Sequence, residues 1–454
     1  MIKTYDQAVE YLKSFIPFTL YQTDAFQKKE LKDPLDRMRY LLNLLDNPER
    51  KFKSVLVGGT SGKGSTSYLI SHILTIAGYK TGLTLSPHLV RINERIQINN
   101  EEISDAIFVE MVNQVIPAIE QMRKSTYDVP SYFEITIAMA FLYFAKEEID
   151  IAIVEVGMGG EYDATNTLEP LVAVLTNVSL DHTQFLGETV EEIAETKGGI
   201  IKNYELGITN YERPIVVTGV SQPSVIKIIE NRCEKVGAKL YRLGKDFFVT
   251  DEQIGLEGEY QKENASLAIE TIKQLHHFDF FVSESIIRKS LKTATFPGRF
   301  EEIKWKMENG KWKIILDGAH NPAKMHAFVT SLQKIYPQQK KVFIIAFKKD
   351  KNIEDMLKEI IPVAESIVAT EFAIGTDTMI SNASYKVDDL TSLILHLKSD
   401  TNIFIEKDSV KAVEKAISLA CHSEQSEESY DPIIAITGSL YLIGELKQRS
   451  TVLA

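Results

Sequence analysis

Cysteine is almost absent from this chain: among 454 residues there are only two, Cys233 and Cys421, far apart in the sequence. Such a pair provides neither a disulfide framework nor a cysteine zinc site, and it fits a reducing compartment. The N-terminus lacks the apolar core of a signal peptide, and no apolar run approaches the roughly 20 residues that a membrane helix needs. We therefore expect a cytoplasmic protein that does not span a membrane.

Positive charge is also in deficit. The chain carries 51 Lys and Arg residues against 63 Asp and Glu residues, a formal net charge of −12. No basic stripe offsets this balance, which argues against a nucleic-acid partner and means that local positive sites must hold any anionic substrate. At roughly 100 to 200 residues per domain, the length predicts two or three domains.

The most informative stretch is rich in glycine. Gly59-Thr60-Ser61-Gly62-Lys63-Gly64-Ser65 follows the apolar run 54–58 and precedes a helical pattern over 67–77. This order gathers backbone N–H groups at a helix N-terminus, with Lys63 as a point charge and Ser65 as a metal-facing hydroxyl, and predicts a nucleotide polyphosphate site. The usual pattern G-x-x-x-x-G-K-[ST] is altered, because Val57 takes the first glycine position and Gly64 separates Lys63 from Ser65. The alternative is a glycine turn that only lets the helix approach its strand.

Short apolar runs alternate with helical patterns, which predicts an α/β fold with parallel sheets and crossover helices. The first set of expected strands is 54–58, 81–84, 151–156, 172–175 and 214–217, with a helical pair over about 103–123 and 132–148. After residues 296–300 the alternation restarts, with strands expected at 314–316, 342–345, 366–369, 402–405 and 433–436. We predict a first domain over 1–296, a hinge over 297–301 and a second, smaller domain over 302–454. The polar run 421–430 is expected to form an exposed loop.

Two polar side chains follow neighbouring predicted strands. Glu155 lies at the end of strand 151–156, and His182 follows the end of strand 172–175. The carboxyl ends of parallel strands face the ligand crevice, so Glu155 would need a partner there. That partner is either Mg²⁺ beside ATP or, alternatively, a nearby loop that the carboxylate caps, or an Arg or Lys. His182 is either a ligand in the same crevice or an ordinary satisfied histidine.

Six motifs in register resemble the folylpolyglutamate synthase and dihydrofolate synthase branch of the Mur ligase superfamily. They are residues 59–65, Ser86-Pro87-His88-Leu89 with Glu94-Arg95-Ile96, residues 155–166, Leu180-Asp181-His182 with Leu186-Gly187, Phe296-Pro297-Gly298-Arg299, and Asp317-Gly318-Ala319-His320-Asn321-Pro322. They span nearly the whole chain in family order. The resemblance implies a P-loop-containing, Mur-ligase-like ATPase domain followed by a smaller Rossmann-like α/β domain. It also implies ATP-dependent ligation of L-glutamate to a folate or dihydropteroate carboxylate through an acyl phosphate.

The resemblance further implies which residues form the site. The catalytic residues would be Lys63, Lys197, Arg299 and His320. The ATP-binding residues would be Gly59, Thr60, Ser61, Gly62, Lys63, Gly64, Ser65, Asn264, Arg299 and Asp317. The ligands of two Mg²⁺ ions would be Ser65, Ser86, Glu155, His182 and Lys197 as a carbamate, and the imidazole would also suit Mn²⁺. The substrate contacts would be Ser86, His88, Arg95, His320 and Ser439.

Three of these assignments have plain alternatives. Lys197 precedes Gly198-Gly199 and would, without the resemblance, be a helix C-terminal lysine facing the helix dipole. Arg299 would be a linker arginine in a surface salt bridge, and Ser439 would belong to a βα turn without function. If the assignments hold, ATP lies across the domain junction, and domain closure brings Arg299, Asp317 and His320 onto it.

The chain departs from the family pattern at three places. Ser61 replaces Asn, Glu161-Tyr162 replaces Arg-Leu, and Gly198 replaces Ala. The reversed charge at Glu161 puts in doubt any acceptor contact that the arginine makes. Two rival interpretations remain: another Mur-type amino-acid ligase, or a non-catalytic ATP-binding homologue. The sequence does not choose between dihydropteroate and longer folates, and we expect a monomer with small-molecule partners only.

Overall fold

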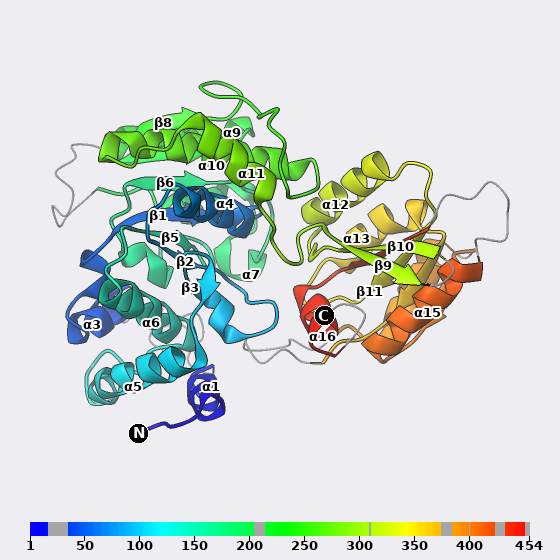
Figure 1. Cartoon of the computed structure of the whole chain (residues 1–454), viewed down its shortest axis with the longest axis horizontal. Coiled ribbons are helices and arrows are strands. Elements are labelled where there is room, and N and C mark those ends of the chain that lie inside the picture. Colours follow the sequence, from blue (N-terminus) through cyan, green and yellow to red (C-terminus); the bar gives the residue numbers. More distant parts are fainter. Residues whose placement is uncertain are drawn as a thin grey trace. The chain divides into compact units, whose positions relative to one another are not determined.

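The structure is a computed structural model that describes residues 1–16, 35–203, 214–307, 310–373, 384–398, 400–422 and 432–449. The chain forms two compact units, shown in Figure 1. The first unit comprises residues 1–255 and 261–294, and the second comprises 256–260 and 295–454. No helix among the described residues is both long and apolar enough to cross a membrane.

The first unit is built on an eight-stranded sheet of order β4-β3-β2-β5-β1-β6-β7-β8. Its strands are β1 (Lys53–Gly58), β2 (Thr81–Thr84), β3 (Ile96–Ile98), β4 (Glu101–Glu102), β5 (Ile151–Glu155), β6 (Val172–Leu175), β7 (Ile215–Thr218) and β8 (Lys239–Arg242). Six neighbouring strands of this sheet, β2, β5, β1, β6, β7 and β8, are parallel. The remaining two, β3 and β4, are antiparallel to their neighbours. The four central strands β2, β5, β1 and β6 are buried almost throughout, as expected for a sheet covered on both faces.

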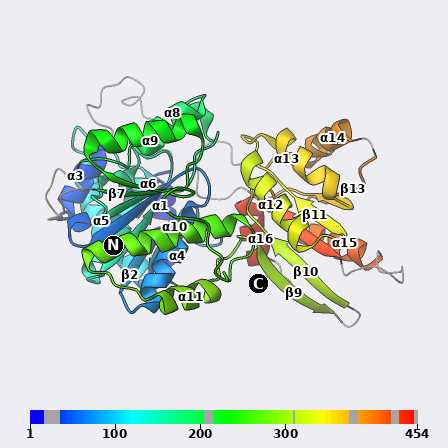
Figure 2. The same ribbon diagram turned by 90° about the horizontal axis from the view of Figure 1, so that it is seen from above.

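Helices cover both faces of this sheet. They are α1 (Tyr5–Lys13), α3 (Asp36–Leu44), α4 (Lys63–Ile76), α5 (Asp105–Met122), α6 (Tyr132–Lys146), α7 (Thr183–Leu186), α8 (Val190–Gly198), α9 (Pro223–Val236), α10 (Tyr260–Leu275) and α11 (Glu284–Thr293). Short 3₁₀ turns are η2 (Pro48–Arg50), η3 (Ile92–Arg95), η4 (Ala164–Thr167) and η5 (His276–Phe278). Figure 2 shows α4, α10 and α11 on one side of the sheet and α8 and α9 on the other.

The second unit has a six-stranded sheet of order β13-β12-β11-β14-β10-β9, in which only β9 is antiparallel to its neighbour. Its strands are β9 (Glu301–Met307), β10 (Gly310–Leu316), β11 (Lys341–Ile345), β12 (Ser366–Ala369), β13 (Ile403–Ile405) and β14 (Ile433–Thr437). Its helices are α12 (Pro322–Ile335), α13 (Ile353–Ile360), η6 (Ile361–Val363), α14 (Val387–Leu397), α15 (Ser409–His422) and α16 (Leu440–Arg449). One apolar core lies between this sheet and helices α12, α13 and α14.

The predicted α/β fold class is confirmed, and every expected strand overlaps an observed one. Strands β3, β4, β8 and β9 were not expected. The polar run 421–430 differs from the predicted loop at its start, because α15 continues to His422, and residues 423–430 lie outside the described residues.

A buried ion pair fixes the start of α6. Arg37 on α3 is 1% exposed, and its guanidinium contacts both carboxylate oxygens of Glu134, at 3.0 Å from Nε and 2.7 Å from Nη2. Glu134 also accepts the backbone N–H of Ser131, the N-cap of α6, at 2.7 Å. The residue before Glu134, Phe133, lies where a Cβ on Gly157 would come within 2.5 Å of its ring. The pair therefore holds an aromatic ring against the loop that follows β5.

We predict that Arg37→Met lowers the free energy of unfolding by about 3–5 kcal/mol, because Glu134 is left buried without its cation. Urea denaturation followed by circular dichroism measures the change. Arg39→Met on the same helix is the matched control: that side chain is 48% exposed, and the change should stay within about 0.5 kcal/mol. Equal stability of the two variants would show that the pair contributes nothing.

Candidate active site

The glycine-rich loop leaves β1 in a conformation that side chains resist. Gly59 has φ +133° and Gly62 has φ +80°. A Cβ on Gly59 would lie 2.0 Å from Thr176 Oγ1, and one on Gly62 would lie 2.2 Å from Asn264 Oδ1. Both positions therefore require glycine on grounds of conformation and of space.

The end of β6 holds this loop through polar contacts. Thr60 N–H donates to Asn177 O at 3.0 Å, and Ser61 N–H donates to Asn177 Oδ1 at 2.9 Å. Thr176 Oγ1 lies 2.6 Å from Ser61 O, and Thr60 Oγ1 accepts the N–H of Ser179 at 3.0 Å. The loop thus takes its shape from a strand more than 100 residues away in the sequence.

Helix α4 begins at Lys63 directly after this turn. Its N-cap, Gly62, provides no side-chain cap, so the first N–H groups of the helix are left for another acceptor. Ser65 lies in the first turn and is 3% exposed. Asn264 on α10 is also buried and donates its amide to Gln261 Oε1 at 2.9 Å. A helix N-terminus with free donors favours a phosphate group.

Glu155 ends β5 next to β1 and is 5% exposed. Its Oε2 accepts the backbone N–H of Ser86 at 2.8 Å, which joins two of the predicted metal ligands directly. A buried carboxylate and a neighbouring hydroxyl residue at a strand end form an oxygen-rich edge. Magnesium takes few protein oxygens and keeps waters and phosphates as its other ligands, so Ser65, Ser86 and Glu155 fit that metal.

No group of three or more His, Cys, Asp and Glu side chains within the described ranges is placed to hold a metal ion. His182, the other predicted ligand, takes φ +50° at the start of α7 and has a side chain that is 40% exposed. Its Nε2 lies 3.9 Å from Asp181 Oδ1. A metal at this edge would therefore depend on nucleotide oxygens and water for most of its ligands.

Lys197 lies on the last turn of α8 and is 4% exposed. Its Nζ donates to the carbonyl of Gly59 at 3.0 Å, so the side chain points at the glycine-rich loop. Lys197 is thus a basic residue in the last turn of its helix, as the alternative of a helix C-terminal lysine requires, and its ammonium also bonds to the glycine-rich loop. Its predicted carbamylation is untested by the contacts.

The loop 86–95 is organised by one carboxylate and one histidine. Glu94 accepts the backbone N–H groups of Leu89, Val90 and Arg91 at 2.6 to 2.8 Å. Arg95, 5% exposed, donates its Nε to His88 Nδ1 at 2.9 Å. Because arginine only donates, the neutral His88 ring carries its proton on Nε2.

The segment after β5 packs directly on the end of α8. A Cβ on Gly160 would lie 2.7 Å from Lys197 O, and one on Gly199 would lie 2.3 Å from Glu161 Cβ. Asp163 within this segment accepts the N–H of Met158 at 2.9 Å, and burial raises the pKa of its carboxyl while these hydrogen bonds lower it. Two backbones in contact fix this segment relative to Lys197.

The second unit carries its predicted residues at the ends of β10 and β14. Asp317 is 5% exposed and accepts three hydrogen bonds: from the Tyr260 hydroxyl at 2.7 Å, and from the backbone N–H groups of Phe300 and Ala319 at 2.9 Å each. Burial raises the pKa of Asp317, while the Tyr260 hydroxyl and the charge of Arg299 lower it. The carboxylate thus has a fixed place between two backbone turns.

Arg299 and His320 lie beside this carboxylate. A Cβ on Gly318 would come within 2.9 Å of Arg299 Nη1, so the guanidinium lies over that glycine. His320 Nδ1 is 2.7 Å from Gly318 O, and its Nε2 is 3.0 Å from Lys324 Nζ. We assign the Nδ1–H tautomer, because the lysine donates and the carbonyl accepts.

Ser439 joins the same strand ends. It is 2% exposed and its Oγ accepts the N–H of Tyr441 at 3.1 Å. The preceding Gly438 has φ +100° and donates its N–H to Ala319 O at 3.1 Å. The turns that carry His320 and Ser439 are therefore hydrogen-bonded to each other.

The structure brings the predicted residues into two sets, one in each unit. The first set contains residues 59–65, Ser86, Glu155, Lys197 and Asn264, and the second contains Arg299, Asp317, His320 and Ser439. His88 and Arg95 form a pair on a loop that starts at Ser86. Sequence reasoning assigned no role to Thr176, Asn177, Tyr260 or Lys324. Thr176 and Asn177 follow a strand next to the glycine-rich loop, which is a usable signal, whereas nothing in the sequence pairs Tyr260 with Asp317.

The chain matches known families along nearly its whole length. Residues 57–272 match the Mur ligase middle domain, and residues 301–449 match the C-terminal domain of dihydrofolate synthetase. The dihydrofolate synthase/folylpolyglutamate synthase of Bacillus subtilis is 32% identical over 461 residues, covering 95% of this chain and 99% of that protein. The folylpolyglutamate synthase of Lacticaseibacillus casei is 31% identical over 435 residues, covering 91% and 93%.

Solved structures agree. Mycobacterium tuberculosis folylpolyglutamate synthase complexed with ADP superposes with a TM-score of 0.84 at 26% identity, covering 98% of this chain and 97% of that one. The folylpolyglutamate synthase of Thermotoga maritima gives 0.76 at 30% identity, covering 98% and 96%. The predicted family resemblance is confirmed.

We predict that Tyr260→Phe lowers the free energy of unfolding by about 1–3 kcal/mol at pH 7.5, because buried Asp317 loses a donor. Loss of that donor raises the pKa of Asp317 further. The cost is therefore present in full above the folded-state pKa of Asp317, which lies above its ordinary value, and falls as the pH drops through it and the carboxyl becomes neutral. Urea midpoints at pH 5 and 7.5 test this.

The matched control is Tyr385→Phe in the same unit, since no hydrogen bond of the Tyr385 hydroxyl is found among the described residues. If Tyr260→Phe lowers the free energy of unfolding by the same amount at both pH values, then the ionisation of Asp317 does not contribute to the effect.

Proposed function

This chain belongs to the family of dihydrofolate synthases and folylpolyglutamate synthases, which are ATP-dependent ligases, and we propose that it joins the amine of L-glutamate to a carboxylate of a folate or dihydropteroate acceptor. The observation that carries the proposal is the lysine-bearing glycine loop beside buried Glu155, in a chain alignable with such ligases over 95% of its length.

The reaction needs activation of a poor electrophile. A carboxylate has no good leaving group, so the acceptor oxygen attacks the γ-phosphorus of ATP and ADP leaves. The acyl phosphate that results is attacked by the uncharged amine of glutamate, and the tetrahedral intermediate expels inorganic phosphate while the amine loses its proton to a base. Each step concentrates negative charge, so preorganised cations and N–H donors are the main catalytic requirement.

The first unit supplies the groups for the polyphosphate. Residues 59–65 offer backbone N–H groups at the start of α4, and Lys63 places an ammonium there. Asn264 lies against Gly62 and is proposed to contact the nucleotide. Nucleotide binding in this family is supported by the ADP complex of the Mycobacterium tuberculosis enzyme.

Magnesium is the metal that the strand-end oxygens fit, and it would supply neutralisation of the phosphate charge when bound. We propose that Ser65, Ser86 and Glu155 serve one ion and His182 a second. The protein's part is to hold Glu155 buried and oriented by the Ser86 N–H. An imidazole at the second ion would also accept manganese.

Lys197 is proposed to act as a carbamate, made when its neutral amine adds CO₂. A carbamate keeps one N–H, which matches the observed donation to Gly59 O. Its carboxylate would then lie near the loop and serve the second metal ion, as an ammonium does not.

The second unit is proposed to complete the site. Arg299 would bind the γ-phosphate with a guanidinium fork, and Asp317 would contact the nucleotide ribose. His320 and Ser439, whose turns are hydrogen-bonded through Gly438 and Ala319, would hold glutamate. Ser86, His88 and Arg95 would contact the acceptor.

We further propose that the enzyme acts in the cytoplasm as a monomer with domains over 1–296 and 302–454. The two isolated cysteines support a reducing compartment. Domain closure over ATP would exclude the water that hydrolyses the acyl phosphate.

Release of ADP that depends on both glutamate and an acceptor tests the function. We expect dihydropteroate, a folate monoglutamate or both to raise the rate well above the rate without acceptor, and mass spectrometry should find a product heavier by one glutamyl residue. If no folate or pteroate acceptor stimulates ADP release, the ligase assignment for this branch is wrong. Running both acceptors in parallel decides the preference.

We predict that Lys197→Ala lowers turnover by about 100-fold, since a group that serves the metal is lost, and that formate or acetate restores part of it. Lys202→Ala is the matched control, because Lys202 also donates its Nζ to a backbone carbonyl, that of Asn166. The control should show no rescue by acids. A ¹³C-bicarbonate carbamate signal in the wild type that is absent from Lys197→Ala would identify the modification, and near-wild-type turnover without acid would contradict it.

A further inference from the structure

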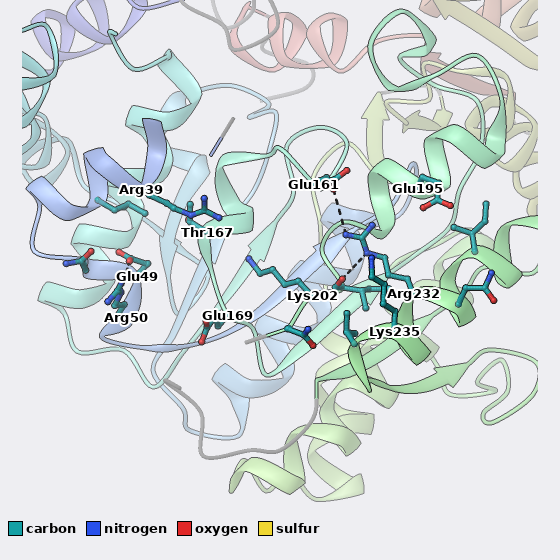
Figure 3. A pocket seen from close by; sticks show the side chains of 17 residues that line it. Arg39, Glu49, Arg50, Glu161, Thr167, Glu169, Glu195, Lys202, Arg232 and Lys235 are labelled. Carbon is teal, nitrogen blue, oxygen red and sulfur yellow. Dashed lines mark hydrogen bonds and ion pairs between the residues drawn. The ribbon is translucent and has the colours of Figure 1, made fainter. Parts of the chain in front are cut away.

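A cavity in the first unit carries charges of both signs. It has a volume of about 650 Å³ and lies among α3, η2, η4 and the ends of α8 and α9 (Figure 3). At one end Arg50 Nε lies 3.3 Å from Glu49 Oε1, and at the other Arg232 Nη2 lies 3.9 Å from Glu161 Oε1. Because both ends hold a cation beside a carboxylate, the lining favours no ligand by its charge. The strand ends of the second unit present an ordered pair of groups instead.

The pair in the second unit consists of Lys324 and His320. Lys324 Nζ lies 3.0 Å from His320 Nε2, and His320 Nδ1 donates to the carbonyl of Gly318 at 2.7 Å. Nε2 is therefore a hydrogen-bond acceptor, while the ammonium of Lys324 is a donor. Both residues are only partly buried, so a ligand can reach the two nitrogens.

Helix stability does not account for Lys324. It lies in the first turn of α12, where the positive end of the helix dipole disfavours a cation. The residues of this turn, 322–325, are all described, and none of them is acidic. The reason for a lysine at this position is thus the contact that its ammonium makes beside His320.

His320 also shares a neighbour with Arg299. The Arg299 guanidinium lies over Gly318, since a Cβ there would come within 2.9 Å of its Nη1, and His320 bonds to the carbonyl of the same glycine. In the proposed reaction Arg299 binds the transferred phosphate. A molecule held by His320 and Lys324 would then lie beside the phosphate of the acyl phosphate, which is where the attacking amine belongs.

An α-amino acid complements this donor and acceptor. Its ammonium and its α-carboxylate are attached to one carbon, so a single molecule can donate to His320 Nε2 and accept from Lys324 Nζ at once. The side-chain carboxylate of glutamate has no ammonium on the neighbouring carbon and could engage only the lysine. The pair therefore distinguishes the two carboxylates of glutamate.

We propose that Lys324 binds the α-carboxylate of the incoming glutamate and that His320 Nε2 receives a proton from its ammonium. This assignment rests on the proposed function and adds the orientation of glutamate to it. One N–H bond of the ammonium breaks as the Nε2–H bond forms. The products are a neutral amine, whose lone pair attacks the acyl phosphate, and an imidazolium whose Nδ1–H stays on Gly318 O.

The α-carboxylate would also make this proton transfer easier. An ammonium 3.0 Å from Nε2 opposes a second positive charge on the ring. Once the α-carboxylate is bound, its negative charge offsets that of Lys324, and the imidazolium is no longer opposed by an uncompensated cation. Recognition of an α-amino acid and formation of the nucleophile are thereby coupled.

Three amino-acid substrates and one variant test the assignment. Rates of ADP release are measured with ATP, a folate or dihydropteroate acceptor and either L-glutamate, L-isoglutamine (α-carboxylate replaced by an amide) or L-glutamine (side-chain carboxylate replaced by an amide). We expect the wild type to prefer glutamate to isoglutamine by about 30-fold or more in kcat/KM. Lys324→Met should lose most of this preference, because the contact with the α-carboxylate is already gone, while its preference for glutamate over glutamine should match the wild type.

Two further variants serve as controls. Lys324→Arg keeps a cationic donor and should retain most of the preference over isoglutamine. Lys334→Met lies in the last turn of α12, where the lysine is 62% exposed and bonds to Glu259 at 2.8 Å, and it should behave as the wild type.

The outcomes separate the assignment from its alternatives. If Lys324→Met slows glutamate and isoglutamine equally, the role of Lys324 is structural and the proposal is overturned. Loss of the preference over glutamine instead would place the side-chain carboxylate at Lys324 and overturn it as well. Absence of glutamate-dependent ADP release in the wild type would refute the proposed function itself, and this assignment with it.

Discussion

The parallel pairing of β1 with β6 is the constraint on which the first unit depends. Gly58 and Leu175 are paired, so the chain leaves both strands side by side. The loop after Gly58 is then bonded to Asn177 through two of its own N–H groups. A loop this rich in glycine has little preference of its own, and the strand end supplies its conformation. The start of α4, with Lys63 and Ser65, follows from that conformation.

Backbone donors place the negative charges in both units. Glu155 accepts a main-chain N–H, and Asp317 accepts two together with a tyrosine hydroxyl. Arginine or lysine as sole partner would neutralise these carboxylates. Main-chain donors instead orient both carboxylates without adding a formal positive charge beside them. Arg37 and Glu134 show the other solution, a closed pair whose function is packing.

The sequence predicts the buried strands well and the site only in part. Strands such as β1, β5 and β14 are continuous apolar runs, which only a covered sheet can accommodate. Strands β3, β4 and β9 lie at or near sheet edges and are short or charged, so no apolar run marks them. Lys63 and Glu155 could be proposed as site residues because their motifs are local. The bond of Tyr260 to Asp317 joins residues 57 apart in the sequence, and no local pattern encodes it.

The contact between residues 160–161 and the end of α8 has a consequence for how this enzyme can change. Two backbones meet there, at Gly160 against Lys197 O and at Gly199 against Glu161. A side chain at either position would clash with backbone atoms, and repacking of neighbouring side chains cannot remove that clash. Even a substitution by alanine is therefore excluded at both positions. Substitutions are absorbed more easily in segments such as 86–95, where the side chains of Glu94, Arg95 and His88 make the contacts. We therefore expect Gly160 and Gly199 to remain glycine, while positions held by side-chain contacts can vary.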